Sequence, residues 1–194
     1  MPKALTTSIL LFFLLLAGLC QASSVSRSFS KNITLMSENI NVSLAVSITL
    51  PQDTYYAIDE SYPSGWTMIS TNGDTNQSGH IKWAVIDNAV NTVYSYTIRA
   101  AASPGNYTFS GFYEFNSTYT NPSSPSIAGQ TLARVRPQGD ITGDACVNIF
   151  DLTTFGSDFG KTSGFNNPGS DIISNGIVDV FDFVIIGRDY TLGC

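Results

Sequence analysis

The chain has 194 residues, of which 43% are hydrophobic and 12% charged, and its formal net charge is −6. This composition supports a packed core and excludes a chain that is disordered throughout. Eight of the fifteen acidic residues lie after Pro137, where the only bases are Lys161 and Arg188, so this tail carries the whole net charge and the part before it is neutral. Because no basic patch could neutralise phosphates, we expect no nucleic-acid partner.

The first residues have the pattern of an export signal. Lys3 is followed by an apolar run over residues 9–19, and small residues precede the expected cleavage point after Ala22. A membrane anchor would need about 20 apolar residues, and a lipid-modified Cys20 is disfavoured because a bulky leucine precedes it. We therefore predict a signal peptide over residues 1–22, a secreted, extracellular or cell-surface location, and no membrane span after cleavage.

Removal of the signal leaves two cysteines, Cys146 and Cys194. An even number of cysteines in an oxidising compartment predicts a disulfide, which would close a loop of about fifty residues and add about 3 to 4 kcal/mol. The alternative is two unpaired thiols. Five sequons for N-glycosylation precede Pro137. They are Asn32, Asn41, Asn76, Asn106 and Asn116.

Residues 24–136 show a period of two, which is typical of strands with one buried face. It is clearest over residues 42–50 and recurs over residues 81–85 and 94–98, with Gly, Pro and Asn turn signals between the runs. We predict about seven short strands and no helix, hence a mainly β antiparallel sandwich. The segments 56–66 and 103–111 resemble Ig-like accessory domains of secreted prokaryotic surface proteins, which implies an Ig-like fold.

This first part offers no catalytic constellation. His80 stands alone in a turn-like stretch, and the neighbouring acids Asp59 and Glu60 would point to opposite faces of a strand. A carbohydrate site would require aromatic side chains on one face, although several of them share parity with core positions. The candidates are Trp66, Trp83, Tyr55, Tyr56, Tyr62, Tyr94 and Tyr96.

Residues 139–194 contain an internal repeat. It superposes Asp140 on Asp171 and Asp151 on Asp182, and each copy opens with a twelve-residue stretch, 140–151 and 171–182. Oxygen-bearing side chains fall at positions 1, 5, 9 and 12 of both stretches. This is the spacing of an EF-hand calcium loop, in which position 7 adds a backbone carbonyl.

The repeat resembles a type I dockerin, a duplicated calcium-binding module of half-EF-hands. The resemblance implies one or two calcium ions, one helix after each loop, and a disulfide that joins the module's termini. Position 3 departs from the pattern, because Thr142 keeps only a hydroxyl and Ile173 offers no ligand, so both sites should be weakened. The implied ligands are Asp140, Thr142, Asp144, Asn148 and Asp151 with the Cys146 carbonyl, and Asp171, Asn175, Asp179 and Asp182 with the Ile177 carbonyl.

The same resemblance implies a cohesin-type protein as partner. It assigns partner contacts to loop positions 10 and 11 and to one position on each following helix, although these side chains could equally fill the module's own core. They are Ile149, Phe150, Ser157, Val180, Phe181 and Arg188.

The sequence thus predicts a signal peptide (1–22), an Ig-like sandwich (24–136) and a dockerin-like calcium-binding domain (139–194). We interpret the whole as a secreted, non-catalytic adaptor that docks to a cohesin-type partner. The alternatives are a carbohydrate-binding component of a polysaccharide-degrading complex, a small hydrolase, and a structural surface-layer protein whose tail makes homotypic contacts.

Overall fold

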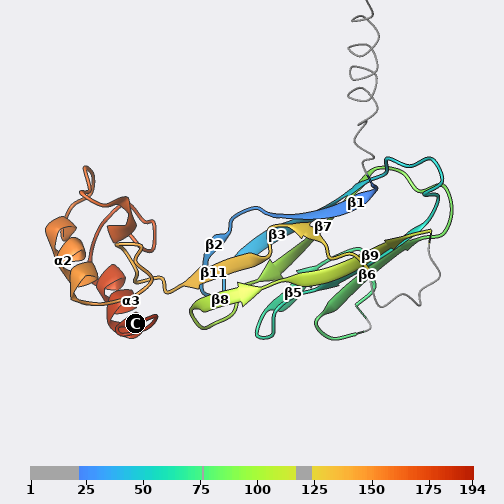
Figure 1. Cartoon of the computed structure of the whole chain (residues 1–194). Coiled ribbons are helices and arrows are strands. Elements are labelled where there is room, and N and C mark those ends of the chain that lie inside the picture. Colours follow the sequence, from blue (N-terminus) through green and yellow to red (C-terminus); the bar gives the residue numbers. More distant parts are fainter. Residues whose placement is uncertain (1–21, 76, 117–123) are drawn as a thin grey trace, which may run out of the picture.

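The computed structural model describes residues 22–75, 77–116 and 124–194. The predicted signal peptide lies outside these residues except for its last residue, Ala22. The sequon residue Asn76 also lies outside them. Figure 1 shows an elongated β lobe joined at one end to a small helical lobe, with the connection passing through residues 137–139. No helix within the described ranges is both long and apolar enough to cross a membrane.

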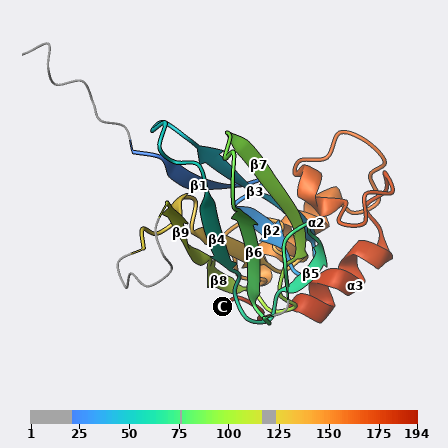
Figure 2. The ribbon, with the colours of Figure 1, turned by 90° about the vertical axis from the view of Figure 1, so that its right-hand side faces the viewer.

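The β lobe consists of three hydrogen-bonded groups of strands, in the orders β10-β1-β3-β7-β5, β2-β11-β8 and β6-β4-β9. Figures 1 and 2 show the five-stranded sheet packed against the other two groups. The strands are β1 (Ser24–Phe29), β2 (Ile33–Leu35), β3 (Asn39–Ser47), β4 (Tyr56–Ser61), β5 (Thr67–Ser70), β6 (His80–Val85), β7 (Thr92–Arg99), β8 (Gly105–Thr108), β9 (Ser110–Phe115), β10 (Ala128–Gly129) and β11 (Leu132–Arg136).

The period of two fixes which face of each strand is buried. On β3, Val42, Leu44 and Val46 point into the core and their neighbours point outward, and β3 pairs antiparallel with both β1 and β7. The mainly β sandwich is therefore confirmed. Most strand pairs are antiparallel as predicted, but β1 pairs with β10 and β2 with β11 in parallel.

A buried ion pair crosses the sandwich between two sheets. Arg27 on β1 donates to both carboxylate oxygens of Glu60 on β4, at 2.7 and 2.6 Å, and Tyr96 on β7 donates its hydroxyl to the same carboxylate at 2.8 Å. Both charged side chains are fully buried. Burial raises the pKa of Glu60, and the hydrogen bonds from Arg27 oppose that rise. The pair links the two sheets inside an otherwise apolar core.

The helical lobe contains α2 (Ile149–Asp158), the short 3-10 turn η1 (Pro168–Ser170) and α3 (Val180–Asp189). Each α-helix begins after a polar N-cap residue whose side chain accepts a backbone N–H, and the third helical residue completes a capping box. The buried apolar core of this lobe is small. It comprises Ile141, Val147, Phe155, Val178 and Ile186.

Candidate functional site

The two twelve-residue stretches form loops with the same hydrogen bonds at the same positions. We call residues 140–151 loop 1 and residues 171–182 loop 2. At position 1, the Asp140 carboxylate accepts the N–H of Ala145 at 2.9 Å, and the Asp171 carboxylate accepts the N–H of Gly176 at 2.9 Å. The first carboxylate therefore folds each loop back on its position 6.

Positions 5 and 7 are paired in the same way. The side-chain oxygen of Asp144 accepts the N–H of Cys146 at 2.8 Å, and that of Asn175 accepts the N–H of Ile177 at 2.9 Å. These bonds hold the backbone at position 7, whose carbonyl the EF-hand spacing assigns as a ligand. The match shows that the repeat seen in the sequence is also a repeat in three dimensions.

The carboxylate at position 12 closes each loop. Asp151 accepts the N–H of Thr142 at 2.9 Å and Asp182 accepts the N–H of Ile173 at 3.1 Å, and each also accepts the N–H of its loop's position-9 residue, at 2.9 and 3.0 Å. Both carboxylates are fully buried. The departures at position 3 therefore leave the backbone hydrogen bond from position 3 to position 12 intact in both loops. In loop 1, the hydroxyl of Thr142 also donates to Asp151.

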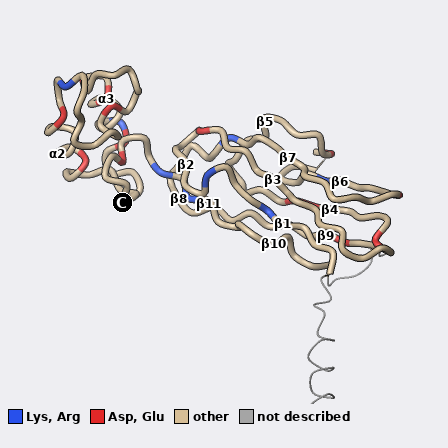
Figure 3. The backbone as a smooth tube through the Cα atoms, turned by 90° about the horizontal axis from the view of Figure 1, so that it is seen from above, with Lys and Arg blue, Asp and Glu red and all other residues tan. Residues whose placement is uncertain are grey.

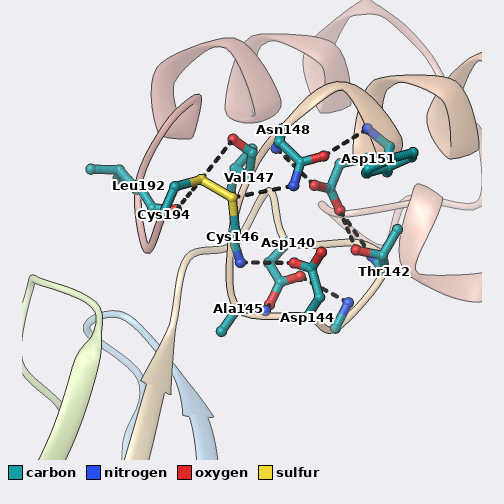
Figure 4. Close-up of a disulfide and its surroundings, with 12 residues drawn as sticks. Asp140, Thr142, Asp144, Ala145, Cys146, Val147, Asn148, Asp151, Leu192 and Cys194 are labelled. Carbon is teal, nitrogen blue, oxygen red and sulfur yellow. Dashed lines mark hydrogen bonds between the residues drawn. A yellow bond between two sulfur atoms is a disulfide. The ribbon is translucent and has the colours of Figure 1, made fainter.

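The C-terminus closes loop 1, and residues 160–161 close loop 2 through the matching backbone hydrogen bonds with Val178. Cys146 and Cys194 form a disulfide (Figure 4), and Val147 exchanges backbone hydrogen bonds with residues 191–192. Gly193 packs so tightly that a Cβ there would lie 1.9 Å from the carbonyl oxygen of Ala145. Ala145 itself is held at a φ of 80°, a left-handed conformation that favours glycine. In loop 2 the corresponding residue is Gly176, and loop 2 contains no cysteine.

A buried aspartate at the end of each helix anchors the chain just before the other loop. Asp158 accepts the N–H groups of Asn166 and Asn167 at 2.7 and 2.9 Å, and Asp189 accepts the N–H of Gly139 at 3.0 Å. Burial acts to raise the pKa of Asp158, but hydrogen bonds from Lys161, backbone N–H groups and a serine hydroxyl outweigh burial and hold that pKa below its ordinary value. These contacts fix the entry to each loop.

The donor set of the loops fits a hard cation, since every side-chain ligand offers oxygen. A carboxylate has about four acceptor positions. In loop 2, Asp171 and Asp182 each accept two hydrogen bonds; in loop 1, Asp140 and Asp151 each accept three. Within the described residues, no three acidic, histidine or cysteine side chains converge closely enough to hold a metal ion. Most of these hydrogen bonds come from backbone N–H groups.

The residues expected to contact a partner are mostly exposed. Ile149 and Phe150 begin α2, Val180 and Phe181 begin α3, and these four side chains are 55 to 66% exposed. Arg188 does not project freely, because its guanidinium binds its neighbour, an aspartate, and the side chain of a glutamine at the joint between the lobes. The apolar pairs therefore lie on the surface rather than in the module's core.

The sandwich does not show a catalytic relay in its described part. Asp59 and Ser61 both contact the same ring nitrogen of His80, Nδ1, at 2.6 and 3.1 Å, so the histidine does not link the two groups. Glu60 points into the core instead of joining Asp59. No opposed pair of carboxylates results.

The aromatic side chains considered for carbohydrate binding mostly belong to the core. Trp66, Trp83, Tyr56 and Tyr96 are at most 6% exposed, and two further tyrosines pack against them. Only Tyr55 is exposed among these residues. Most of these aromatics are therefore core residues, as their parity with core positions indicated, and they do not form a sugar-stacking platform.

The described sequons differ in how free their side chains are. Asn32, Asn41 and Asn106 are exposed, and the Asn41 side chain accepts a hydrogen bond from the Thr97 hydroxyl at 2.8 Å. Asn116, by contrast, accepts two backbone N–H groups from residues 54–55 and donates to Asp53. Its side chain closes a turn of the sandwich.

Comparison with known proteins gives fold neighbours only. No model of a protein family matches the chain, and no curated protein does. Similar solved structures include a cohesin–X-dockerin complex of Acetivibrio cellulolyticus (10% identity, 59% of this chain and 99% of that chain, TM-score 0.40). Others are a non-cellulosomal cohesin from the archaeon Archaeoglobus fulgidus (10%, 59% and 93%, 0.39) and a type III cohesin from a cell-surface anchoring scaffoldin of Ruminococcus flavefaciens (9%, 58% and 87%, 0.40).

These neighbours correct the interpretation drawn from the sequence. The matched modules are cohesins, so the prediction of a dockerin-bearing adaptor with a cohesin as its partner is wrong, and so is the Ig-like comparison. Over the described residues after Pro137, the chain adds two ten-residue helices and one 3-10 turn, and no dockerin domain is evident. The resemblance misled because a repeated acidic loop is a short pattern that several helical arrangements can carry.

Arg136 is a residue of the loops that the sequence analysis overlooked. It lies at the end of β11 and its Nη1 contacts the Asp140 carboxylate at 3.1 Å. Arg134, two residues earlier, donates to the backbone carbonyl of Asp144 at 3.3 Å. The signal was present in the sequence, since a base stands four residues before the first loop aspartate.

Proposed function

We propose that this chain is an extracellular, non-catalytic calcium-binding protein, with a sandwich domain over residues 24–136 followed by a two-loop domain over residues 139–194. The observation that carries the proposal is the repeat of one hydrogen-bond pattern in loop 1 and loop 2, with oxygen donors at positions 1, 5, 9 and 12 of each. The concentration of acids in this part of the chain, visible in Figure 3, supports it.

Each loop would hold one ion through side-chain oxygens and one backbone carbonyl. When bound, calcium would neutralise the carboxylates of the loop and link the start of the loop to the first turn of the following helix. A domain with so small an apolar core gains stability from such a link. The proposed ligands are Asp140, Thr142, Asp144, Cys146, Asn148 and Asp151 in loop 1, and Asp171, Asn175, Ile177, Asp179 and Asp182 in loop 2.

The test is a calorimetric titration of calcium into chelator-treated protein comprising residues 23–194. We expect saturable binding, with Asp151→Asn removing one site and Asp182→Asn the other, since each change deletes one charge and one of the two carboxylate oxygens that accept backbone N–H groups. Asp87→Asn, an exposed acid in the sandwich, is the matched control and should bind as the unmodified protein does. Absence of binding at millimolar calcium would rule out the proposal.

A second candidate function is recognition of a protein partner by the open face of β6, β4 and β9. The observation that favours it is Phe112, which is 55% exposed beside Asp59 on the neighbouring strand. An exposed aromatic side chain among charged ones is typical of binding hot spots. One similar cohesin was solved in complex with a dockerin.

The corresponding test is calorimetry of the full chain against a panel of isolated dockerin modules. Binding that Phe112→Ala weakens at least tenfold, with Val93→Ala on the opposite sheet as the control, would support this second function. Binding that both variants retain, or no binding across the panel, would exclude this face.

A further inference from the structure

Loop 1 and loop 2 carry the same number of side-chain charges but differ in their surroundings. Each loop has three aspartates and one asparagine among the proposed side-chain ligands. Loop 1 also receives Arg136, whose Nη1 lies 3.1 Å from the Asp140 carboxylate. Among the residues that the structure describes, no lysine, arginine or histidine forms an ion pair with a loop 2 carboxylate.

Arg136 places a positive charge on a carboxylate that a cation in loop 1 would share. The Asp140 side chain is fully buried and Arg136 is three-quarters buried. A Cβ added to Gly143, at loop position 4, would lie 3.1 Å from the same guanidinium nitrogen. Like charges this close repel strongly when solvent is largely excluded.

The guanidinium of Arg136 also has an unsatisfied hydrogen-bond donor. Its Nε is buried and has no hydrogen-bond partner in the described structure, so the Asp140 carboxylate is the contact that holds the side chain. Because the residue ends β11, its contact with loop 1 is at the same time a contact between the sandwich and the helical domain.

We infer that Arg136 is a built-in counter-ion of loop 1, which makes loop 2 the tighter calcium site. This inference rests on the proposed calcium function. It deepens that function by assigning an order to two sites that the repeat alone makes equivalent.

The experiment measures each loop separately by calorimetry of the full chain. In an Asp182→Asn background only loop 1 remains, and Arg136→Gln should raise its calcium affinity about tenfold. In an Asp151→Asn background only loop 2 remains, and the same substitution should leave the affinity unchanged. Lys82→Gln, which removes a positive charge that pairs with Asp59 on the sandwich, is the control and should change neither affinity.

Further variants separate a charge effect from damage to the fold. Arg136→Lys keeps the charge and should keep the calcium affinity of loop 1 low. If Arg136→Gln does not fold, Arg136→Met removes the charge with a side chain of similar length. Calcium binding in which Arg136→Gln and Arg136→Met leave loop 1 unchanged would overturn the inference and leave the proposed function standing. Absence of calcium binding in every variant, the unmodified chain included, would overturn the proposed function itself.

Discussion

The sandwich and the helical domain reach a folded state by different means. Among the described residues, the sandwich buries eighteen apolar residues in one core around the pair of Arg27 and Glu60, whereas the helical domain buries five. Its shortage of apolar burial is offset by carboxylates that accept backbone N–H groups, by capping boxes and by a disulfide. The difference teaches that the acidic residues of the tail have structural partners even before any cation is considered.

The largest effect should come from breaking the ion pair in the sandwich. Glu60→Ala leaves the Arg27 charge buried without a partner and should lower the free energy of unfolding of the sandwich by about 3 to 5 kcal/mol. Tryptophan fluorescence measures this selectively, because both tryptophans, Trp66 and Trp83, lie in the sandwich. Asp59→Ala, on the outer face of the same strand, should cost about 1 kcal/mol or less. Equal losses in the two variants would contradict the account.

The disulfide should matter to the helical domain alone. Replacing Cys146 and Cys194 together by serine should destabilise this domain by about 2 to 4 kcal/mol, because the bridge closes a loop across 48 residues. Scanning calorimetry should show the helical transition moving to lower temperature while the tryptophan transition of the sandwich stays in place. A shift of the tryptophan transition instead would mean that the two domains do not unfold independently.

Acid should act on the helical domain through Asp158. Its folded-state pKa lies below the ordinary aspartate value, so its contribution is present above the unfolded pKa of about 4. That contribution is lost as the pH falls from about 5 through the folded-state pKa. Thermal unfolding followed by circular dichroism should show the loss, and Asp158→Asn should flatten it. An unchanged slope in the variant would remove Asp158 as the cause.

The smallest effect should distinguish the two loops at position 6. Ala145→Gly relieves a left-handed conformation and should stabilise the helical domain by about 0.5 to 1 kcal/mol, and Gly176→Ala should destabilise it by about 1 kcal/mol. A Cβ on Gly176 meets no atom within 4 Å, so backbone strain is the only expected cost. Denaturant unfolding of both variants measures the two effects, and changes of the same sign would contradict this explanation.

Much of the fold could be predicted from the alternation of residues. The buried faces of β3 and β6 follow the period of two, and the internal repeat of the tail predicted the matching loops. The parallel partners β2 and β10 have three and two residues, too few to show a period. The buried pair was visible in principle, since Glu60 shares parity with Ile58 and Arg27 with Val25, but a charge is ordinarily assigned to the outer face.

The candidate site was predicted in its composition and missed in its surroundings. The loop oxygens follow from spacing alone, whereas the closure of loop 1 by residues 191–194 depends on where the C-terminus returns. The contact of Arg136 depends on how the sandwich meets the tail. The assignment of a cohesin as partner failed because it transferred an interaction from a family whose domain the structure does not show.

The most direct test of the central claim is a calcium titration of nitrogen-15-labelled, chelator-treated protein that follows the amide signals of Gly176 and Ala145. Both N–H groups donate to the first aspartate of their loop. The account predicts that both signals shift saturably, that of Gly176 at lower calcium than that of Ala145. Signals that stay in place up to millimolar calcium would contradict the claim that these loops bind calcium.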